Sequence, residues 1–133
     1  MILGDTKSIE EALAEAFAKA DALGAPLGER LKAYLAESRR ILPDLEASYD
    51  ELVERLKASE ADLLVPAIGE KMPDFLMTDS EGRLVDLSGL LRNGPAVLSF
   101  NRGSWCDYCG LELNALARAY PEIAAAGGEV VAI

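Results

Sequence analysis

Two cysteines separated by two residues, Cys106 and Cys109, lie between an apolar run and a helical pattern. They are the only cysteines among the 133 residues. The apolar run at residues 95–100 predicts a β-strand, and the leucine spacing in residues 111–118 predicts a helix that opens at the first cysteine. A helix N-terminus offers free backbone N–H groups and partial positive charge, both of which favour a thiolate over a thiol. The pattern therefore predicts a reactive thiol at a strand-to-helix junction.

A Cys-x-x-Cys pair has three common interpretations: a redox pair, half of a zinc site, or two inert buried thiols. A zinc site needs about four ligands, but the chain has no histidine and no third cysteine. Zinc would then require a second chain, and we expect no metal. Without histidine, Cys-His and Ser-His-Asp catalysis are also excluded. The strand, turn and helix around the pair favour the redox interpretation.

Within that interpretation Cys106 is the nucleophile, because it stands at the helix start. Cys109 lies one turn further on, where it can attack a sulfenic acid or mixed disulfide on Cys106 and form an intramolecular disulfide. Arg102 either adds positive charge beside the thiol or is an ordinary surface arginine. Trp105 either shields the thiol or packs in the core. Asp107 repels a thiolate, but as an early helix residue it suits the helix dipole.

Composition narrows the classes of partner. The chain carries 23 acidic and 13 basic residues, for a net charge of −10. No cluster of Lys or Arg is present to contact phosphates, so we expect neither nucleic-acid binding nor docking on anionic membranes. No apolar run approaches the roughly 20 residues that span a bilayer. The start of the chain does not resemble a signal peptide, and we expect a cytoplasmic protein.

Residues 1–65 predict an N-terminal module of about three helices. Ser8 and Glu11 have the spacing of a capping box, and Gly24 marks the end of the first helix. A second amphipathic segment runs from about residue 27 to residue 42. Pro43 breaks it, and Asp44 can cap a third helix.

Each of these helices carries one apolar stripe that must be covered. The stripe of the third helix comprises Leu45, Tyr49, Leu52, Val53 and Leu56. The stripes can form an intramolecular layer over the second half of the chain, or they can serve as a dimerisation element. The two alternatives are compatible, and we expect a homodimer.

Residues 66–133 predict a β-hairpin followed by a β–α–β unit, which is an α/β pattern. The expected elements are strands at 69–78 and 83–87, a short helix or turn at 88–94, a strand at 96–100, a helix from Cys106 to about Tyr120 and a strand at 129–133. Strand 96–100 is apolar on both faces, as a central buried strand is. Pro121 should kink or interrupt the helix. Because these elements are few for a sheet, we expect the N-terminal part of a longer protein, or a sheet completed by another chain.

Two segments carry a family resemblance: residues 72–87, and residues 97–113 with the run Arg-Gly-Ser-Trp-Cys-Asp-Tyr-Cys. They resemble the alkyl hydroperoxide reductase/thiol-specific antioxidant (AhpC/TSA) family. The similarity is to its peroxiredoxin-like branch with an Arg-Gly-x-Trp-Cys-x-x-Cys signature. It covers about residues 66–133, and the N-terminal helices resemble that branch's helical extension. The resemblance implies a partial thioredoxin-like core, a hairpin plus β–α–β, behind the helical module.

The resemblance also implies a function. Cys106 would be the peroxidatic cysteine of an antioxidant oxidoreductase that reduces hydrogen peroxide or organic hydroperoxides, and Cys109 would resolve it. A thioredoxin-type partner would return electrons, with no metal or organic cofactor. Typical peroxiredoxins carry proline and threonine or serine where this chain has Ser99 and Gly103. Ser104 is then the nearest hydroxyl to assist substrate binding.

Two alternatives stay open. The Trp-Cys-x-x-Cys run also resembles thioredoxin, which implies a protein disulfide reductase with a disulfide substrate. The chain can also be interpreted as a truncated, non-catalytic module that dimerises through its helices.

Overall fold

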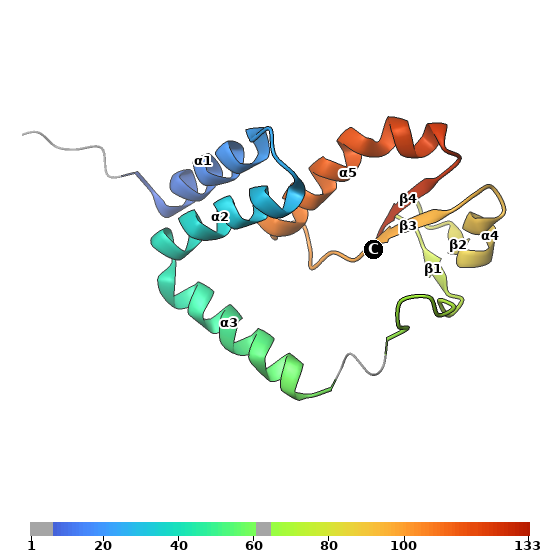
Figure 1. Cartoon of the computed structure of the whole chain (residues 1–133), viewed down its shortest axis with the longest axis horizontal. Coiled ribbons are helices and arrows are strands. Elements are labelled where there is room, and N and C mark those ends of the chain that lie inside the picture. Colours follow the sequence, from blue (N-terminus) through green and yellow to red (C-terminus); the bar gives the residue numbers. More distant parts are fainter. Residues whose placement is uncertain (1–6, 61–64) are drawn as a thin grey trace, which may run out of the picture.

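A computed structural model describes residues 7–60 and 65–133. Three helices come first, followed by a hairpin and a parallel β–α–β unit (Figure 1), so the predicted α/β class is confirmed. The elements are α1 (Ile9–Ala22), α2 (Leu27–Ile41), α3 (Pro43–Ala58), β1 (Leu76–Thr78), β2 (Leu84–Asp86), α4 (Leu87–Leu91), β3 (Ala96–Ser99), α5 (Asp107–Ala125) and β4 (Glu129–Ala132). The start of the chain, on which the signal-peptide prediction depends, lies outside the described residues. None of the helices in the described ranges is long and apolar enough to cross a membrane.

The ends of the first three helices follow local rules, with one correction. The predicted capping box is present: the Ser8 hydroxyl accepts from the Glu11 N–H, and the Glu11 carboxylate accepts from the Ser8 N–H. The prediction that Asp44 caps the third helix is wrong. Helix α3 already begins at Pro43, and no side chain caps it. Proline suits the first helical position because its fixed φ is helical and that position needs no N–H donor.

The core joins the helical module to the helix that follows the cysteines. Leu111 of α5 is 0% exposed and packs against Ala16 and Ala20 of α1 and Tyr34 of α2. The Tyr34 ring meets the Tyr108 ring edge-on, with the ring centroids 5.1 Å apart. Helices α1 and α2 thus cover the N-terminal part of α5, as an intramolecular layer would.

Helix α3 is the least covered of the three. It packs on α2 and diverges from α1 (Figure 1), and Arg39 pairs with Asp50 to link α2 to α3. The apolar residues of its stripe are largely exposed: Leu45, Leu52, Val53 and Leu56. Part of the stripe therefore lacks a cover within the described chain, and the expected homodimer stays a prediction.

The second half contains two separate two-stranded sheets. Strands β1 and β2 are antiparallel and joined by a turn at residues 79–82, in which Asp79 accepts from the N–H groups of Glu81 and Arg83. Strands β3 and β4 are parallel and joined through α5, so the predicted crossover is confirmed. The first strand is shorter than expected, because β1 begins only at Leu76, beyond Pro73.

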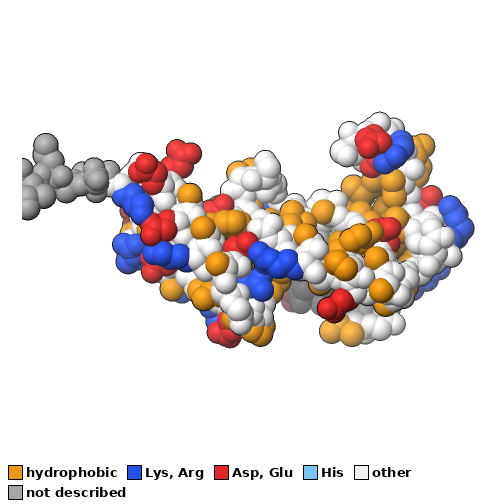
Figure 2. Space-filling model, turned by 90° about the horizontal axis from the view of Figure 1, so that it is seen from above, with side chains coloured by type: hydrophobic (Ala, Val, Ile, Leu, Met, Phe, Trp, Pro, Cys, Tyr) orange, Lys and Arg blue, Asp and Glu red, His pale blue; other side chains and the backbone are white. Residues whose placement is uncertain are grey.

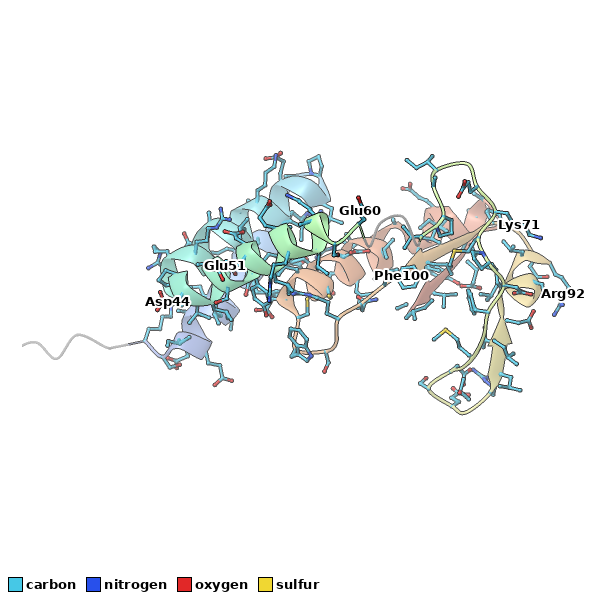
Figure 3. All side chains as sticks on the ribbon, turned by 90° about the horizontal axis from the view of Figure 1, so that it is seen from below. Asp44, Glu51, Glu60, Lys71, Arg92 and Phe100 are labelled. Atoms are coloured by element: carbon cyan, nitrogen blue, oxygen red, sulfur yellow. The ribbon has the colours of Figure 1, made fainter. Side chains whose placement is uncertain are left out.

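Two further expectations for this half are wrong. Of the predicted kink or interruption at Pro121, the interruption is wrong, because helix α5 continues to Ala125. The missing N–H removes one hydrogen bond close to the end of the helix, where little structure depends on it. The expected strand 96–100 is not buried on both faces, because Val97 of β3 is exposed and so is Phe100, which follows β3. Hydrophobic side chains accordingly show on the surface of the strand-bearing half (Figure 2), and Phe100 lies where β3 leads toward α5 (Figure 3).

Candidate active site

The two cysteines are free thiols in direct contact at the start of α5. Cys106 is the N-cap residue, and its Sγ accepts a hydrogen bond from the Cys109 backbone N–H at 3.2 Å. The Cys109 Sγ lies 2.6 Å from the Cys106 Sγ. A helix that starts one residue after the first cysteine places the second on the next turn, which explains this contact. The pair is therefore arranged for thiol chemistry in which one sulfur attacks the other.

Arg102 supplies positive charge to both sulfurs. Its Nη2 lies 3.1 Å from the Cys106 Sγ, and its backbone N–H donates to the Cys109 Sγ at 3.4 Å. Burial raises the pKa of Cys109, but hydrogen bonds from Cys106 and Arg102 outweigh it, so that the pKa of Cys109 lies below its usual value. The contact with Cys106 raises the pKa of Arg102 further. Of the two interpretations of Arg102, the structure favours the one beside the thiol.

Three aromatic rings surround the guanidinium of Arg102. Its Cζ lies 5.1 Å from the ring centroid of Tyr49, 5.4 Å from Trp105 and 5.9 Å from Tyr108. Cation–π attraction of this kind restricts where an arginine head can go. Gly103 makes the arrangement possible: its φ is 144°, and a Cβ there would lie 2.5 Å from the Trp105 indole nitrogen. Glycine at this position lets the indole fold back beside Arg102.

The other two predicted supporting residues, Trp105 and Ser104, differ in how they relate to the cysteine pair. Trp105 is 64% exposed, so core packing is wrong for it, and its ring lies near Arg102 instead. Ser104 is exposed, and within the described ranges its hydroxyl makes no hydrogen bond to either sulfur. The structure thus brings Arg102 and Trp105 to the cysteine pair, but not the Ser104 hydroxyl.

The two residues between the cysteines contact the helical module. Asp107 accepts a hydrogen bond from the Tyr34 hydroxyl. The Tyr108 hydroxyl donates to Glu46 Oε1 at 2.9 Å, and Glu46 also accepts from the Ser38 hydroxyl. Burial, and then the neighbouring carboxylates, raise the pKa of Tyr34 and Tyr108, so both hydroxyls remain protonated donors.

These contacts were missed at the sequence level. Tyr34 and Tyr49 belong to apolar stripes, and nothing in their spacing indicates that they face the cysteines. Glu46 is only 5% exposed although it is charged, and helical periodicity gave no signal for it. A buried carboxylate needs hydrogen-bond donors, and here Ser38 and Tyr108 supply them.

Cys106 opens into a pocket whose volume is ≈ 170 Å³. Both thiols are well covered, with 5% of Cys106 and 9% of Cys109 exposed. The walls come mainly from the helical module and are largely apolar or aromatic: Leu13, Tyr34, Ser38, Leu42, Leu45, Glu46, Tyr49, Arg102, Trp105, Asp107 and Tyr108. Cys109 does not line this pocket, which leaves Cys106 as the sulfur that an entering molecule meets.

A metal site has no support among the side chains that the structure describes. Nowhere in residues 7–60 and 65–133 do three or more His, Cys, Asp or Glu side chains gather as metal ligands would.

Known proteins are similar in sequence to the second half of the chain. The sequence model of the AhpC/TSA family matches residues 68–133. Thiol-disulfide oxidoreductase ResA of Bacillus anthracis is 35% identical over 66 residues, which is 50% of this chain and 37% of that protein. The ResA of Bacillus subtilis strain 168 is 34% identical over 65 residues, 49% of this chain and 35% of that protein. The match thus spans little more than a third of these relatives, and no solved structure matches significantly. Through residues 68–133 the chain belongs to the AhpC/TSA family of thioredoxin-like proteins.

Proposed function

We propose that Cys106 and Cys109 form the redox centre of a thiol oxidoreductase that reduces a small hydroperoxide. The observation that carries this proposal is the placement of Cys106, which is 5% exposed and faces a pocket of ≈ 170 Å³. A hydroperoxide can enter such a pocket and reach the sulfur. A disulfide within a folded protein must bring its own backbone to a sulfur that is only 5% exposed and has residues of α2 and α3 beside it.

The reaction takes two steps on this chain. The Cys106 thiolate attacks one oxygen of the O–O bond, the bond breaks, and the departing alkoxide or hydroxide takes up a proton, leaving a sulfenic acid on Cys106. The Cys109 sulfur, 2.6 Å from Cys106, then attacks the oxidised sulfur. The S–O bond breaks, water leaves and the Cys106–Cys109 disulfide forms. A dithiol reductant of the thioredoxin type would restore both thiols by exchange.

Arg102 supports the first step. Its guanidinium, 3.1 Å from the Cys106 sulfur, stabilises negative charge there and donates toward an oxygen that approaches that sulfur. The rings of Tyr49, Trp105 and Tyr108 keep the guanidinium near the sulfur. No cofactor is required, because the sulfur itself accepts the oxygen.

Stopped-flow oxidation of the reduced protein by hydrogen peroxide tests the proposal. Trp105 is the only tryptophan, so its fluorescence should report events near Arg102. We expect Cys109→Ser to accumulate a sulfenic acid on Cys106 that dimedone traps, and Cys106→Ser to be inert. A rate constant for oxidation no larger than that of free cysteine, in a folded sample, would refute the proposed peroxidase activity.

A second candidate is thiol-disulfide exchange with a disulfide substrate. The similarity to ResA favours it, because that relative is a thiol-disulfide oxidoreductase by name. The same two sulfurs serve both reactions, so the substrate decides between them. Insulin reduction with dithiothreitol separates the candidates: acceleration together with slow peroxide oxidation supports exchange, and absence of acceleration removes it.

A further inference from the structure

We infer that Tyr49, on α3, is a positioning residue that keeps the guanidinium of Arg102 beside the Cys106 sulfur. It acts on that sulfur only through Arg102. This inference rests on the proposed function in taking Cys106 as the reactive thiol, and it adds the group that controls how reactive the thiol is. Tyr49 lies outside residues 68–133, so part of the activation comes from the helical module and not from the family segment.

The guanidinium of Arg102 is the only cation among the described residues that line the pocket at Cys106. The other titratable groups around that sulfur are hydroxyls, carboxylates and the second thiol: Tyr34, Glu46, Tyr49, Asp107, Tyr108 and Cys109. Arg102 is exposed, however, and a free arginine side chain has many rotamers that carry its head into solvent. Whatever restricts the guanidinium therefore determines how much positive charge lies beside the sulfur.

Of the three rings around the guanidinium, that of Tyr49 is the closest, with its centroid 5.1 Å from the Arg102 Cζ. Trp105, at 5.4 Å, is 64% exposed, so little holds its own ring in place. Tyr108, at 5.9 Å, lies near the limit of about 6 Å for a cation–π contact. These two rings belong to the segment that carries the cysteines, whereas Tyr49 approaches from a separate helix.

Contacts on both sides of Tyr49 hold its ring in place. Glu46, about one turn before it, is 5% exposed and accepts from the Tyr108 hydroxyl at 2.9 Å. Asp50, the next residue, pairs with Arg39 of α2 at 2.9 Å. The ring is consequently fixed relative to α2 and to the first turn of α5, which is where a guanidinium has to be held to reach the sulfur.

Alkylation of Cys106 by iodoacetamide, read by peptide mass spectrometry on the full chain, tests the inference. We expect Tyr49→Leu to lower the rate constant at pH 7 about threefold, as the loss of one cation–π contact at an exposed site would. Tyr49→Phe should restore the wild-type rate, because the contact uses the face of the ring and not the hydroxyl. A rate in Tyr49→Phe as low as in Tyr49→Leu would overturn the inference.

Leu52→Ala is the matched control. Leu52 lies on the same helix and belongs to the same apolar stripe, but it does not line the pocket. Its substitution removes apolar surface from α3 without touching the Arg102 contact, so the alkylation rate should equal that of wild type. A loss as large as in Tyr49→Leu would show that any damage to α3 slows the thiol, and it would overturn the specific role of Tyr49.

The pH profile of alkylation separates positioning from shielding. If Tyr49 acts through the charge beside the thiol, the rates of wild type and Tyr49→Leu differ at pH 7. They then converge at a pH above both thiol pKa values, where Cys106 is fully thiolate in each protein. If the tyrosine only shields the sulfur, Tyr49→Leu reacts faster at every pH, and the inference is overturned.

A double-mutant cycle with Arg102→Gln tests whether Tyr49 acts through Arg102. In the Arg102→Gln background, Tyr49→Leu should slow alkylation no further, because the group that the ring positions is gone. An equal loss in both backgrounds would show that Tyr49 supports the fold and not the guanidinium, which overturns the inference. If circular dichroism shows that leucine disturbs α3, Tyr49→Met carries the same cycle, since its unbranched apolar side chain suits a helix.

The outcomes separate this inference from the proposed function. If hydrogen peroxide oxidises the wild type no faster than free cysteine, while Tyr49→Leu still slows alkylation only when Arg102 is present, the peroxidase fails and the positioning role stands. If peroxide oxidation is fast but Tyr49→Leu leaves alkylation unchanged, the function stands and the positioning role is overturned.

Discussion

Replacing Arg102 by glutamine would isolate what one guanidinium contributes to the reactivity of Cys106. The side chain contributes the 3.1 Å contact between Nη2 and the Cys106 sulfur. The two backbone donors at the pair survive the substitution: the Cys109 N–H, 3.2 Å from the Cys106 sulfur, and the residue 102 N–H, 3.4 Å from the Cys109 sulfur. The variant therefore removes charge while leaving the turn geometry intact.

The contacts set the expected size of the effect. A hydrogen bond to a charged group is worth about 1.5–3 kcal/mol. Arg102 is exposed, however, and solvent screening reduces exposed charge pairs to about 1 kcal/mol. Since about 1.4 kcal/mol corresponds to a factor of ten, we expect Arg102→Gln to slow thiolate-dependent reactions at neutral pH about fivefold.

Alkylation of the reduced protein by iodoacetamide at pH 7, followed by mass spectrometry, measures this effect. Arg102→Lys should fall between wild type and Arg102→Gln, because lysine keeps the charge but loses the planar group that lies near the aromatic rings. Arg92→Gln is the charge-matched control, because Arg92 lies at the far end of the strand-bearing half (Figure 3). Equal rates for wild type and Arg102→Gln would refute the argument that this guanidinium activates the thiol.

Four further predictions follow from buried contacts. Leu111→Ala should lower the free energy of unfolding by about 2–5 kcal/mol in urea titrations; a loss below about 1 kcal/mol would contradict the core described above. Glu46→Gln weakens the acceptor for the Tyr108 hydroxyl, so amide hydrogen exchange in α3 should speed up while α5 stays protected. Equal acceleration in both helices would contradict the role of this hydrogen bond in holding α3. The pKa values of Tyr34 and Tyr108 are raised in the folded state, so their protonated hydroxyls stabilise the fold at any pH below the unfolded tyrosine pKa of about 10. This stabilisation is lost as the pH rises from there through the folded pKa. The urea midpoint of unfolding should thus fall above pH 10, and it should fall less in Tyr34→Phe than in the wild type. If the midpoint falls equally with pH in both proteins, the Tyr34 hydroxyl does not contribute this pH dependence. The lowered pKa of Cys109 works in the other direction. The stability that the Cys109 thiolate contributes is fully present above the unfolded thiol pKa of about 8.5 and is lost as the pH falls through the folded pKa. Cys109→Ser should therefore flatten the pH dependence of the urea midpoint below about pH 8.5.

Features that the sequence predicted correctly are encoded within a few residues. Ser8 and Glu11 satisfy each other's backbone donors, so their spacing alone identifies the helix start. Cys106 and Cys109 meet for the same reason: once a helix starts after Cys106, its first turn decides where the second sulfur lies. The parallel crossover follows from the order strand, helix, strand.

Features that the sequence did not predict depend on competition or on distance. Pro43 ends α2 as predicted, but it also opens α3, where Asp44 was expected to act as the cap. Pro121 lies within α5, because the cost of proline depends on which N–H would have been bonded. The hydroxyl of Tyr34 meets Asp107, 73 residues away, and that of Tyr108 meets Glu46, 62 residues away. Helical periodicity tells which face a residue occupies, but it does not name the partner on another element.

Asp107 shows how the helical module changes the interpretation of the cysteine pair. By charge alone its carboxylate disfavours a thiolate on Cys106 or on Cys109. In the structure that carboxylate accepts from the Tyr34 hydroxyl of α2, while Tyr108, the next residue, donates to Glu46 of α3. The residues between the two sulfurs are thus the attachment points of two helices, and groups that share contacts in this way are energetically coupled. A substitution at Asp107 or Tyr108 should therefore alter both thiol reactivity and the walls of the pocket. Helices α2 and α3 thus have to be treated as part of the site, although they lie outside the family segment.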